Sequence, residues 1–152
     1  MSVSDSARPT GTAAVRRVAT CVAIGGRGLL IEGASGSGKS SLALALLDDG
    51  ATLVGDDGVE LSARHGRLVA EPVPSIAGKL EIRGVGLVDF PATSAPVALV
   101  LKLDREPPRW PGERVCETIC GIAIPALPFA AFDMPMAARA RQALAVHGLP
   151  LP

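Results

Sequence analysis

Residues 29–57 read LLIEGASGSGKSSLALALLDDGATLVGDD, and this stretch decides the fold class. The apolar residues at 29–31 predict a short buried strand that runs directly into a glycine-rich loop. From Lys39 to Asp48, strong helix formers carry leucines at helical spacing, which predicts a helix that Gly50 ends. Residues 52–55 predict a second buried strand. A strand, a loop, a helix and a strand in this order are typical of an α/β protein.

The loop after the first strand, Gly33–Ser40, reads GASGSGKS and fits G-x-x-x-x-G-K-[ST] at every fixed position. Its glycines allow close backbone approach, so successive N–H groups can point inward around an anion. The helix adds its partial positive charge, Lys39 adds a full charge for the β- and γ-phosphates, and Ser40 adds a hydroxyl for Mg²⁺. We expect the nucleotide to bind to Gly33, Ala34, Ser35, Gly36, Ser37, Gly38, Lys39, Ser40 and Ser41. A Gly/Ser-rich loop that contains a lysine by chance is the alternative, and the flanking strand and leucine-rich helix argue against it.

Two adjacent aspartates, Asp56 and Asp57, follow the second strand. In proteins with such a phosphate-binding loop, an acidic residue at a neighbouring strand end holds Mg²⁺ or orients the nucleophile. Adjacent side chains of an extended chain point in different directions, so one carboxylate can bind the metal while the other accepts a proton from an attacking hydroxyl. The alternative is an ordinary Asp-Asp-Gly turn at a strand end. The loop just upstream favours the functional interpretation.

The remaining chain predicts more strands and one more helix. We expect strands at 15–24, 97–103 and 115–124, a hairpin of 59–63 with 67–70, loops at 72–86 and 106–113, and a closing helix from Asp133 or Met134 to His147. Residues 1–14 are rich in Ser, Thr, Ala and Pro and predict a disordered tail, and 15–152 predict a single domain. The predicted architecture is an α/β fold in which a mixed β-sheet with few helices contains the phosphate-binding loop.

Composition and charge exclude several other classes of protein. The chain has 152 residues, of which 48% are hydrophobic and 20% charged, as in a single globular domain. Lys and Arg number 15 and Asp and Glu number 15, so no net charge attracts nucleic acid or an anionic membrane. No apolar stretch is long enough to span a bilayer, and the first 14 residues do not read as a signal peptide. The three cysteines suit a reducing compartment, and we expect a cytoplasmic protein.

Three segments together resemble a known family. The run from Gly33 to Leu61 and the later segment LEIRGVGLVDF (80–90) are similar to the catalytic domain of HPr kinase/phosphorylase, which joins this loop and an Asp-Asp strand end to an E-I-R-G-x-G signature. Residues 109–113, RWPGE, resemble the R-L-x-x-E loop of that family more weakly. The resemblance covers roughly residues 15–132. It implies the fold of the HPr kinase C-terminal domain, in a short form that lacks the N-terminal domain of larger members.

The resemblance implies a reaction and a metal. Members of the family use ATP and Mg²⁺ to phosphorylate a serine of HPr, a phosphocarrier of the sugar phosphotransferase system, and they reverse this step by phosphorolysis. By position, Asp56 is implied to be the base that activates the serine hydroxyl, and the acid in the reverse direction. Ser40, Asp57 and Glu81 are implied to support Mg²⁺.

The resemblance also implies two arginines and an assembly. Arg83 and Arg109 are implied to contact phosphate or to stabilise charge in the transition state. If residues 80–84 are extended, Glu81 and Arg83 point to the same side, and both can then reach the phosphate site. A hexamer is implied by the resemblance alone.

Two alternatives to a kinase of HPr stay open. One is a small-molecule kinase with the same loop, which predicts an arginine-rich lid. The other is a regulator that binds ATP and has weak or no chemistry. The second is favoured by Val18, where the family has a histidine, and by Ser41, where an acidic residue is frequent.

Overall fold

The structure, a computed structural model, describes residues 14–110, 112–113 and 115–152. The predicted tail, residues 1–14, lies outside the described residues except for Ala14. Within the described part of the chain there are two α-helices, α2 (Lys39–Asp48) and α3 (Met136–His147), and a single 3₁₀ turn, η1 (Pro74–Ile76). The predicted helix at 39–48 is confirmed, and so is an α/β fold with a mixed sheet and few helices.

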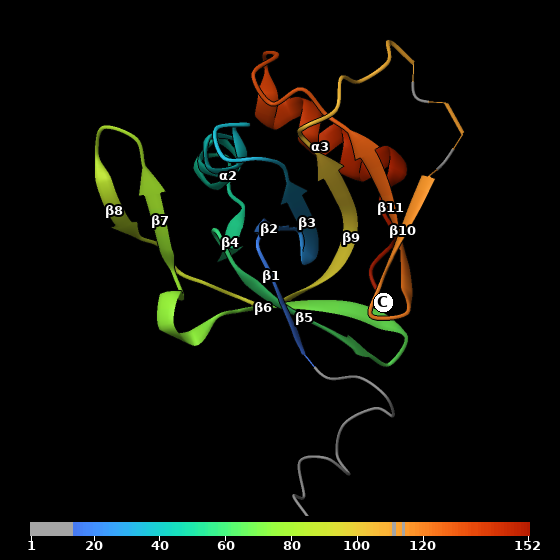
Figure 1. The fold of residues 1–152 in the computed structure, drawn as a ribbon, viewed down its shortest axis with the longest axis horizontal. Helices are drawn as coiled ribbons and strands as arrows, with labels where there is room; N and C mark the ends of the chain where they lie inside the picture. Colours follow the sequence, from blue (N-terminus) through green and yellow to red (C-terminus); the bar gives the residue numbers. More distant parts are fainter. Residues whose placement is uncertain (1–13, 111, 114) are drawn as a thin grey trace, which may run out of the picture.

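Nine strands of the described chain form one sheet with two branches that share β9 (Ala95–Lys102), as Figure 1 shows. The first branch has the order β4 (Thr52–Gly55), β2 (Thr20–Ile24), β3 (Arg27–Glu32), β9, β11 (Ile122–Pro128) and β10 (Val115–Ile119). The second branch leaves the start of β9 and has the order β6 (Arg67–Pro72), β5 (Val59–Arg64) and β1 (Val15–Arg17). A separate hairpin, β7 (Lys79–Ile82) and β8 (Gly86–Asp89), projects beside α2.

Four strands of the first branch end at the same edge of the sheet. β3 pairs in parallel with β9, and β9 pairs in parallel with β11. Because β2 is antiparallel to both β3 and β4, β4 runs in the same direction as β3. The carboxyl ends of β4, β3, β9 and β11 therefore lie together, and this is the edge at which open α/β sheets bind ligands. The glycine-rich loop leaves it from β3, and the paired aspartates leave it from β4.

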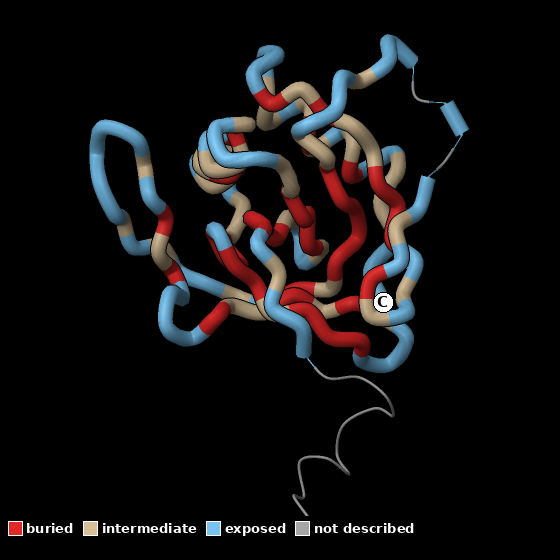
Figure 2. The backbone as a smooth tube through the Cα atoms, in the orientation of Figure 1, coloured by how far each residue is buried: buried red, intermediate tan, exposed pale blue. Residues whose placement is uncertain are grey.

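The central strands of the first branch, β3 and β9, are buried on both faces. In β3, Leu30 enters a core shared with the second branch, where it meets residues such as Leu61. Leu29 and Ile31 enter a second core beneath the helices, together with Leu42 of α2. Figure 2 shows the buried residues running along the central strands. This arrangement explains why the strands read as continuous apolar runs rather than alternating ones.

The predicted strand at 15–24 is in fact two strands. β1 pairs with β5, whereas β2 pairs with β3 and β4, so the chain passes from one branch to the other at Val18 and Ala19. Val18 is 75% exposed there, while Ala19 is fully buried. Apolar residues continue through this change of branch, and the sequence pattern therefore does not reveal it.

Two other segments predicted as single elements are hairpins. The strand expected at 115–124 turns at Cys120 and Gly121, whose φ angles of 52° and 79° are those of a type I′ turn. The loop expected at 72–86 contains β7 and the turn that joins it to β8. The hairpin predicted around His65 and Gly66 is confirmed, and α3 begins at Met136, slightly later than predicted. Neither helix of the described chain has the length and apolar character needed to cross a membrane.

Candidate functional site

The glycine-rich loop connects the end of β3 to the first turn of α2. Gly36 and Gly38 have φ angles of 84° and 105°, which lie in the left-handed region that favours glycine. A Cβ atom at Gly38 would also lie 2.9 Å from Cζ of Phe132, so the packing of a distant segment excludes a side chain there. The N-cap residue of α2 is Gly38, and no side chain of the described residues caps this end of the helix. Its first N–H groups and its dipole therefore face the loop, as an anion site requires. The predicted residues 33–41 all lie in this loop and this first turn.

The side chain of Lys39 folds back over the loop. Its ammonium donates to the carbonyl oxygen of Gly33 at 2.5 Å and to that of Ala34 at 3.4 Å. These two acceptors hold the ammonium against the backbone of its own loop. A phosphate offers a full negative charge in place of two carbonyl dipoles, and the ammonium can move to it without leaving the loop.

Asp56 is the acidic side chain that the fold brings to the start of α2. It is only 9% exposed, and its Oδ1 atom accepts hydrogen bonds from the hydroxyls of Ser40 and Thr20, each at 2.9 Å. No described residue donates to its Oδ2 atom. The carboxylate is therefore fixed through one oxygen, and the other is left to accept a metal or a proton.

Asp57 has a different environment from its neighbour. Its side chain is exposed and its φ angle is 60°, in the left-handed region. The chain turns tightly at the two aspartates, because a Cβ atom at Gly55 would lie 2.4 Å from the carbonyl oxygen of Gly58. The two carboxylates are thus separated by burial and by backbone conformation, which suits the expectation that they take different roles.

The oxygens at this point are of the kind that Mg²⁺ prefers, but among the described residues no group of three or more His, Cys, Asp or Glu side chains is placed to hold a metal ion, so phosphate oxygens of a substrate would have to complete the site. The hydroxyl of Ser40 and the carboxylate of Asp56 are hard ligands, and they already lie within hydrogen-bond distance of each other. Mg²⁺ is usually held by one or two carboxylates together with the phosphates of a substrate. The exposed carboxylate of Asp57 is adjacent in sequence and adds a further oxygen donor of the same kind.

Glu81, Arg83 and Arg109 are not bonded to this centre through any hydrogen bond or ion pair among the described residues. Glu81 is exposed on β7, where its neighbour Leu80 is buried in the core beneath α2. Arg83 lies in the turn between β7 and β8 rather than in an extended segment, so it does not share a strand face with Glu81. Arg109 is exposed in the segment between β9 and β10. Within the described residues none of the three makes a hydrogen bond or an ion pair to the loop or to Asp56.

Sequence analysis did not identify Thr20 and Asp104 as site residues. Thr20 is fully buried in β2 and donates to Asp56. Asp104 follows β9, and its Oδ1 atom accepts a hydrogen bond from the backbone N–H of Ala34 at 2.7 Å. A signal for each is present in the sequence: Thr20 is the one hydroxyl in an apolar strand, and Asp104 comes directly after the strongest predicted strand.

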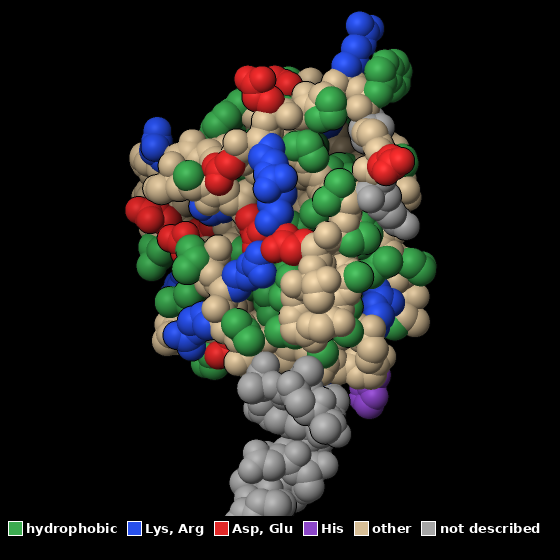
Figure 3. All heavy atoms as spheres, turned by 45° about the vertical axis from the view of Figure 1, so that its right-hand side comes forward, with side chains coloured by type: hydrophobic (Ala, Val, Ile, Leu, Met, Phe, Trp, Pro, Cys, Tyr) green, Lys and Arg blue, Asp and Glu red, His purple; other side chains and the backbone are tan. Residues whose placement is uncertain are grey.

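Four charged side chains lie directly beneath the start of the loop. Glu32, the residue before Gly33, pairs with Arg17 and with Lys102, the latter at 2.5 Å. Glu117 pairs with the same two cations, each at 2.6 Å. Figure 3 shows Lys and Arg side chains lying against Asp and Glu side chains on one face of the molecule. We call Arg17, Glu32, Lys102 and Glu117 the charge cluster.

The charge cluster shifts the pKa of its members in a consistent way. Burial alone would raise the pKa of Glu117, but hydrogen bonds from Lys102 and Arg17 outweigh burial and lower it. Burial alone would lower the pKa of Lys102 and of Arg17, and in both cases hydrogen bonds to Glu117 and Glu32 outweigh burial and raise it. All these shifts favour the charged forms, so the cluster fixes the ends of three strands below the loop.

Comparisons with known proteins give this chain a family. Residues 12–95 match the HPr Serine kinase C-terminal domain family. The chain is 43% identical over 67 residues to an HPr kinase/phosphorylase of Clostridium tetani, which is 44% of this chain and 22% of that protein. It is 49% identical over 69 residues to one of Streptococcus thermophilus, which is 45% of this chain and again 22% of that protein. The chain thus spans about a fifth of the length of these curated relatives.

A solved structure extends the likeness beyond the matched segment. The HPr(Ser) kinase/phosphatase of Coxiella burnetii superposes with a TM-score of 0.71 and 26% sequence identity, and the match covers 84% of this chain and 96% of that one. The family match covers more than half of the chain, including the glycine-rich loop, the paired aspartates and the β7–β8 hairpin. The chain therefore belongs to the HPr serine kinase C-terminal domain family.

Proposed function

We propose that this protein is an ATP-dependent protein serine kinase whose substrate is HPr or an HPr-like phosphocarrier. The observation that carries the proposal is the contact between Ser40 and Asp56, because it joins the end of the glycine-rich loop to a buried carboxylate. A loop alone supports nucleotide binding. A carboxylate held at its end supports transfer of the phosphoryl group as well. The names of the relatives, HPr kinase/phosphorylase, supply the substrate and the reverse reaction.

In this proposal the loop residues 33–41 bind the phosphates of ATP through backbone N–H groups, Lys39 and the dipole of α2. Ser40, with Asp57 and with Glu81 from the projecting hairpin, holds Mg²⁺. When bound, this ion neutralises charge on the β- and γ-phosphate oxygens. Docking of the carrier is proposed to bring the β7–β8 hairpin, and Glu81 with it, against the loop.

Asp56 is the proposed general base. The serine hydroxyl of the carrier attacks the γ-phosphorus, the bond from this phosphorus to the bridging oxygen of ADP breaks, and the hydroxyl proton passes to Asp56. In phosphorolysis inorganic phosphate attacks the phosphoserine, pyrophosphate forms, and Asp56 returns the proton to the serine oxygen. Arg83 and Arg109 extend from an exposed turn and an exposed loop, and they are proposed to contact the transferred group once the carrier is bound.

One observation favours a second function, an ATP-binding regulator with weak chemistry. Val18 occupies the position at which the family has a histidine, and its side chain is 75% exposed. It lies one residue from Arg17 of the charge cluster. The side chain of a valine can neither exchange a proton nor bind phosphate. Any proton transfer in the reaction therefore depends on the aspartates. A hexameric assembly and a cytoplasmic location remain predictions.

The test is phosphorylation of purified HPr by the purified protein with γ-labelled ATP and Mg²⁺. The proposal expects label on a serine of HPr, and it expects release of pyrophosphate when phosphoserine-HPr is incubated with inorganic phosphate. ATP binding without transfer to HPr, at protein concentrations that saturate the carrier, supports the regulator instead. Transfer to a small molecule and not to HPr supports the small-molecule kinase.

A further inference from the structure

The direction of the bound nucleotide follows from the strand order. Asp56 follows β4, which lies on one side of β3, and β9 and β11 lie on the other side. If phosphoryl transfer takes place at Asp56, the γ-phosphate is at the β4 side of the loop. Because a nucleoside triphosphate is an extended chain, its nucleoside then lies toward β9 and β11. This direction rests on the proposed function, because it assumes that the γ-phosphate reacts beside Asp56.

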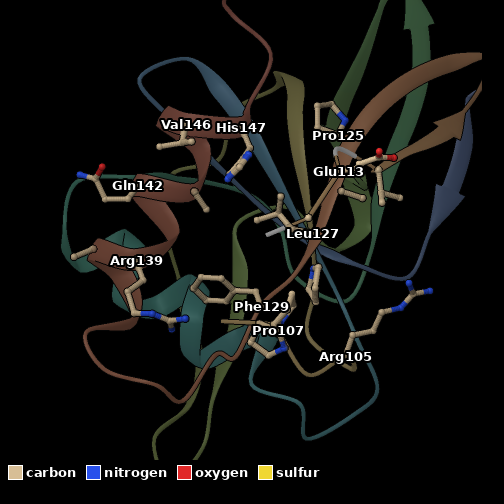
Figure 4. A pocket seen from close by; sticks show the side chains of 17 residues that line it. Arg105, Pro107, Glu113, Pro125, Leu127, Phe129, Arg139, Gln142, Val146 and His147 are labelled. Atoms are coloured by element: carbon tan, nitrogen blue, oxygen red, sulfur yellow. The ribbon is translucent and has the colours of Figure 1, made fainter. Parts of the chain in front are cut away.

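A cavity of about 800 Å³ opens on the β9 and β11 side. Its walls are β11, α3 and the segment after β9, and Figure 4 shows the side chains that line it. Leu127 and Phe129 come from β11 and its end, Gln142 and Arg139 come from α3, and Pro107 comes from the segment after β9. The volume lies in the range that small-molecule sites occupy.

Two walls of this cavity also touch the glycine-rich loop. Asp104 accepts the N–H of Ala34, and the next residue, Arg105, lines the cavity. On the other wall, Phe132 packs against Gly38, and Phe129, at the start of the same segment, lines the cavity. The cavity therefore lies close to the glycine-rich loop, and two short segments connect the cavity lining to that loop.

Arg139 locks the second of these segments in place. Its guanidinium donates to the carbonyl oxygens of Ala130 and Asp133 at 2.9 and 3.1 Å, and it lies 4.7 Å from the centre of the Phe129 ring. The segment between β11 and α3 is thus held at both ends by one side chain. A rigid wall of this kind suits a ligand-binding site more than a surface that reshapes around a protein.

The chemistry of the lining matches a flat aromatic base with a polar edge. Proline rings, Leu127 and the Phe129 ring supply flat apolar surfaces. The amide of Gln142 can both donate and accept hydrogen bonds, and Glu113 on the facing wall accepts them (Figure 4). Arg105 and Arg139 also line the cavity and bring positive charge to its walls.

From this proximity, direction and lining we infer that the cavity binds the base and ribose of the nucleotide whose phosphates occupy the loop. We call it the nucleoside cavity. It makes the protein select a nucleoside triphosphate over a bare polyphosphate, although the loop by itself does not distinguish them.

The test compares ATP with inorganic tripolyphosphate, which has the same phosphates and no nucleoside, by titration calorimetry with Mg²⁺. The wild-type protein is expected to bind ATP at least about tenfold more tightly. Ala138 is exposed on α3 and lines the cavity, so Ala138→Trp fills it without disturbing the core. This variant should lose about tenfold or more in ATP affinity and keep its affinity for tripolyphosphate. Ala145→Trp, exposed on the same helix and outside the cavity lining, is the matched control and should change neither.

Each other result has a distinct meaning. Equal affinities of the wild-type protein for ATP and tripolyphosphate overturn the nucleoside cavity and leave the proposed function standing. An unchanged ATP affinity in Ala138→Trp, with a raised KM for HPr, assigns the cavity to the carrier and overturns the inference. Failure of the wild-type protein to bind either ligand overturns the proposed function itself, and the inference with it.

Discussion

The hydroxyl of Ser40 donates to the Oδ1 atom of Asp56 across 2.9 Å, and this bond joins residues that the sequence separates by sixteen positions. Thr20 donates to the same oxygen from a third element, β2. One carboxylate oxygen therefore connects the start of α2, the end of β4 and the start of β2. A bound metal or substrate would meet an acidic group that three elements hold in a fixed orientation, and such preorganisation is what general-base catalysis requires.

Replacement of Asp56 should affect the chemical step more than binding. A positioned general base contributes ~10²–10⁴-fold to the rate. We expect Asp56→Asn to lose about that much in kcat for HPr phosphorylation while still binding Mg-ATP in a calorimetric titration. Asp57→Asn is the comparison variant: as a proposed Mg²⁺ ligand with an exposed carboxylate, Asp57 should affect Mg-ATP binding more than the chemical step. If Asp56→Asn keeps a rate within a factor of a few of wild type and Asp57→Asn does not, Asp57 is the base.

Removal of the Lys39 ammonium should abolish most nucleotide binding and leave the fold intact. Among the described residues this group bonds only to carbonyl oxygens of its own loop, so its loss removes little from the stability of the core. We expect Lys39→Ala to show a melting temperature close to that of wild type and little heat on titration with ATP or pyrophosphate. Lys79→Ala, at an exposed ion pair with Asp89, should bind both ligands normally. Unchanged ATP affinity in Lys39→Ala would contradict the assignment of the loop.

Thr20 should act as a positioning residue for Asp56. Thr20→Val keeps the shape of the buried side chain and removes the hydroxyl, so Asp56 retains only the bond from Ser40. We expect a loss of about 1 kcal/mol in the free energy of unfolding, measured in urea. We also expect kcat to fall by about tenfold with little change in KM for ATP. Thr20→Ser restores the donor and should recover kcat; a variant that loses only stability would show that Thr20 has a structural role alone.

Arg83 should matter for phosphoryl transfer and little for stability. Its side chain is exposed in the turn of the β7–β8 hairpin and has no ion-pair partner among the described residues. We expect Arg83→Ala to lower the rate of HPr phosphorylation while its melting temperature stays within about 1–2 °C of wild type. Arg64→Ala, near the turn of another hairpin and paired with Glu71, is the control and should not change the rate. A fall in melting temperature at an unchanged rate is the result that a structural role predicts.

The charge cluster should stabilise the folded protein at neutral pH, and this contribution to the free energy of unfolding should be lost in acid. The lowered pKa of Glu117 means that its carboxylate stabilises the fold above its ordinary pKa of 4.5, and that this contribution is lost as the pH falls through the lower folded-state pKa. We expect Glu117→Gln to be less stable than wild type by about 1 kcal/mol at pH 7, and the difference to shrink below about pH 4.5. Thermal unfolding from pH 3 to pH 7 measures it.

The control for this experiment is Glu60→Gln, which removes a surface ion pair with Arg16 and should cost less than about 0.5 kcal/mol at any pH. A stability difference between wild type and Glu117→Gln that stays constant down to pH 3 would show that Glu117 acts through packing rather than charge.

The sequence by itself determined the glycine-rich loop, the helix that follows it and the strand that carries the paired aspartates. These features depend on short-range rules. Glycine is required where φ is positive, as at Gly36 and Gly38, and leucines at helical spacing make a face that must be buried. The resemblance to a family rested on the same local segments, and the family match confirmed it. The hairpins at 79–89 and 115–128 were missed because apolar residues continue on both sides of their turns.

Only the tertiary structure decided which distant side chains meet. Arg17 reaches Glu117 across a hundred positions, Lys102 reaches Glu32 across seventy, and Asp104 reaches Ala34 across seventy. The pattern of apolar and polar residues along a strand indicates which residues share a face. It does not indicate which strand lies next to it in the sheet. That neighbour is set by the order β4, β2, β3, β9, β11, which depends on how whole faces are buried against each other. The partners of Asp56, the charge cluster and the nucleoside cavity all follow from this order, and no local pattern encodes it.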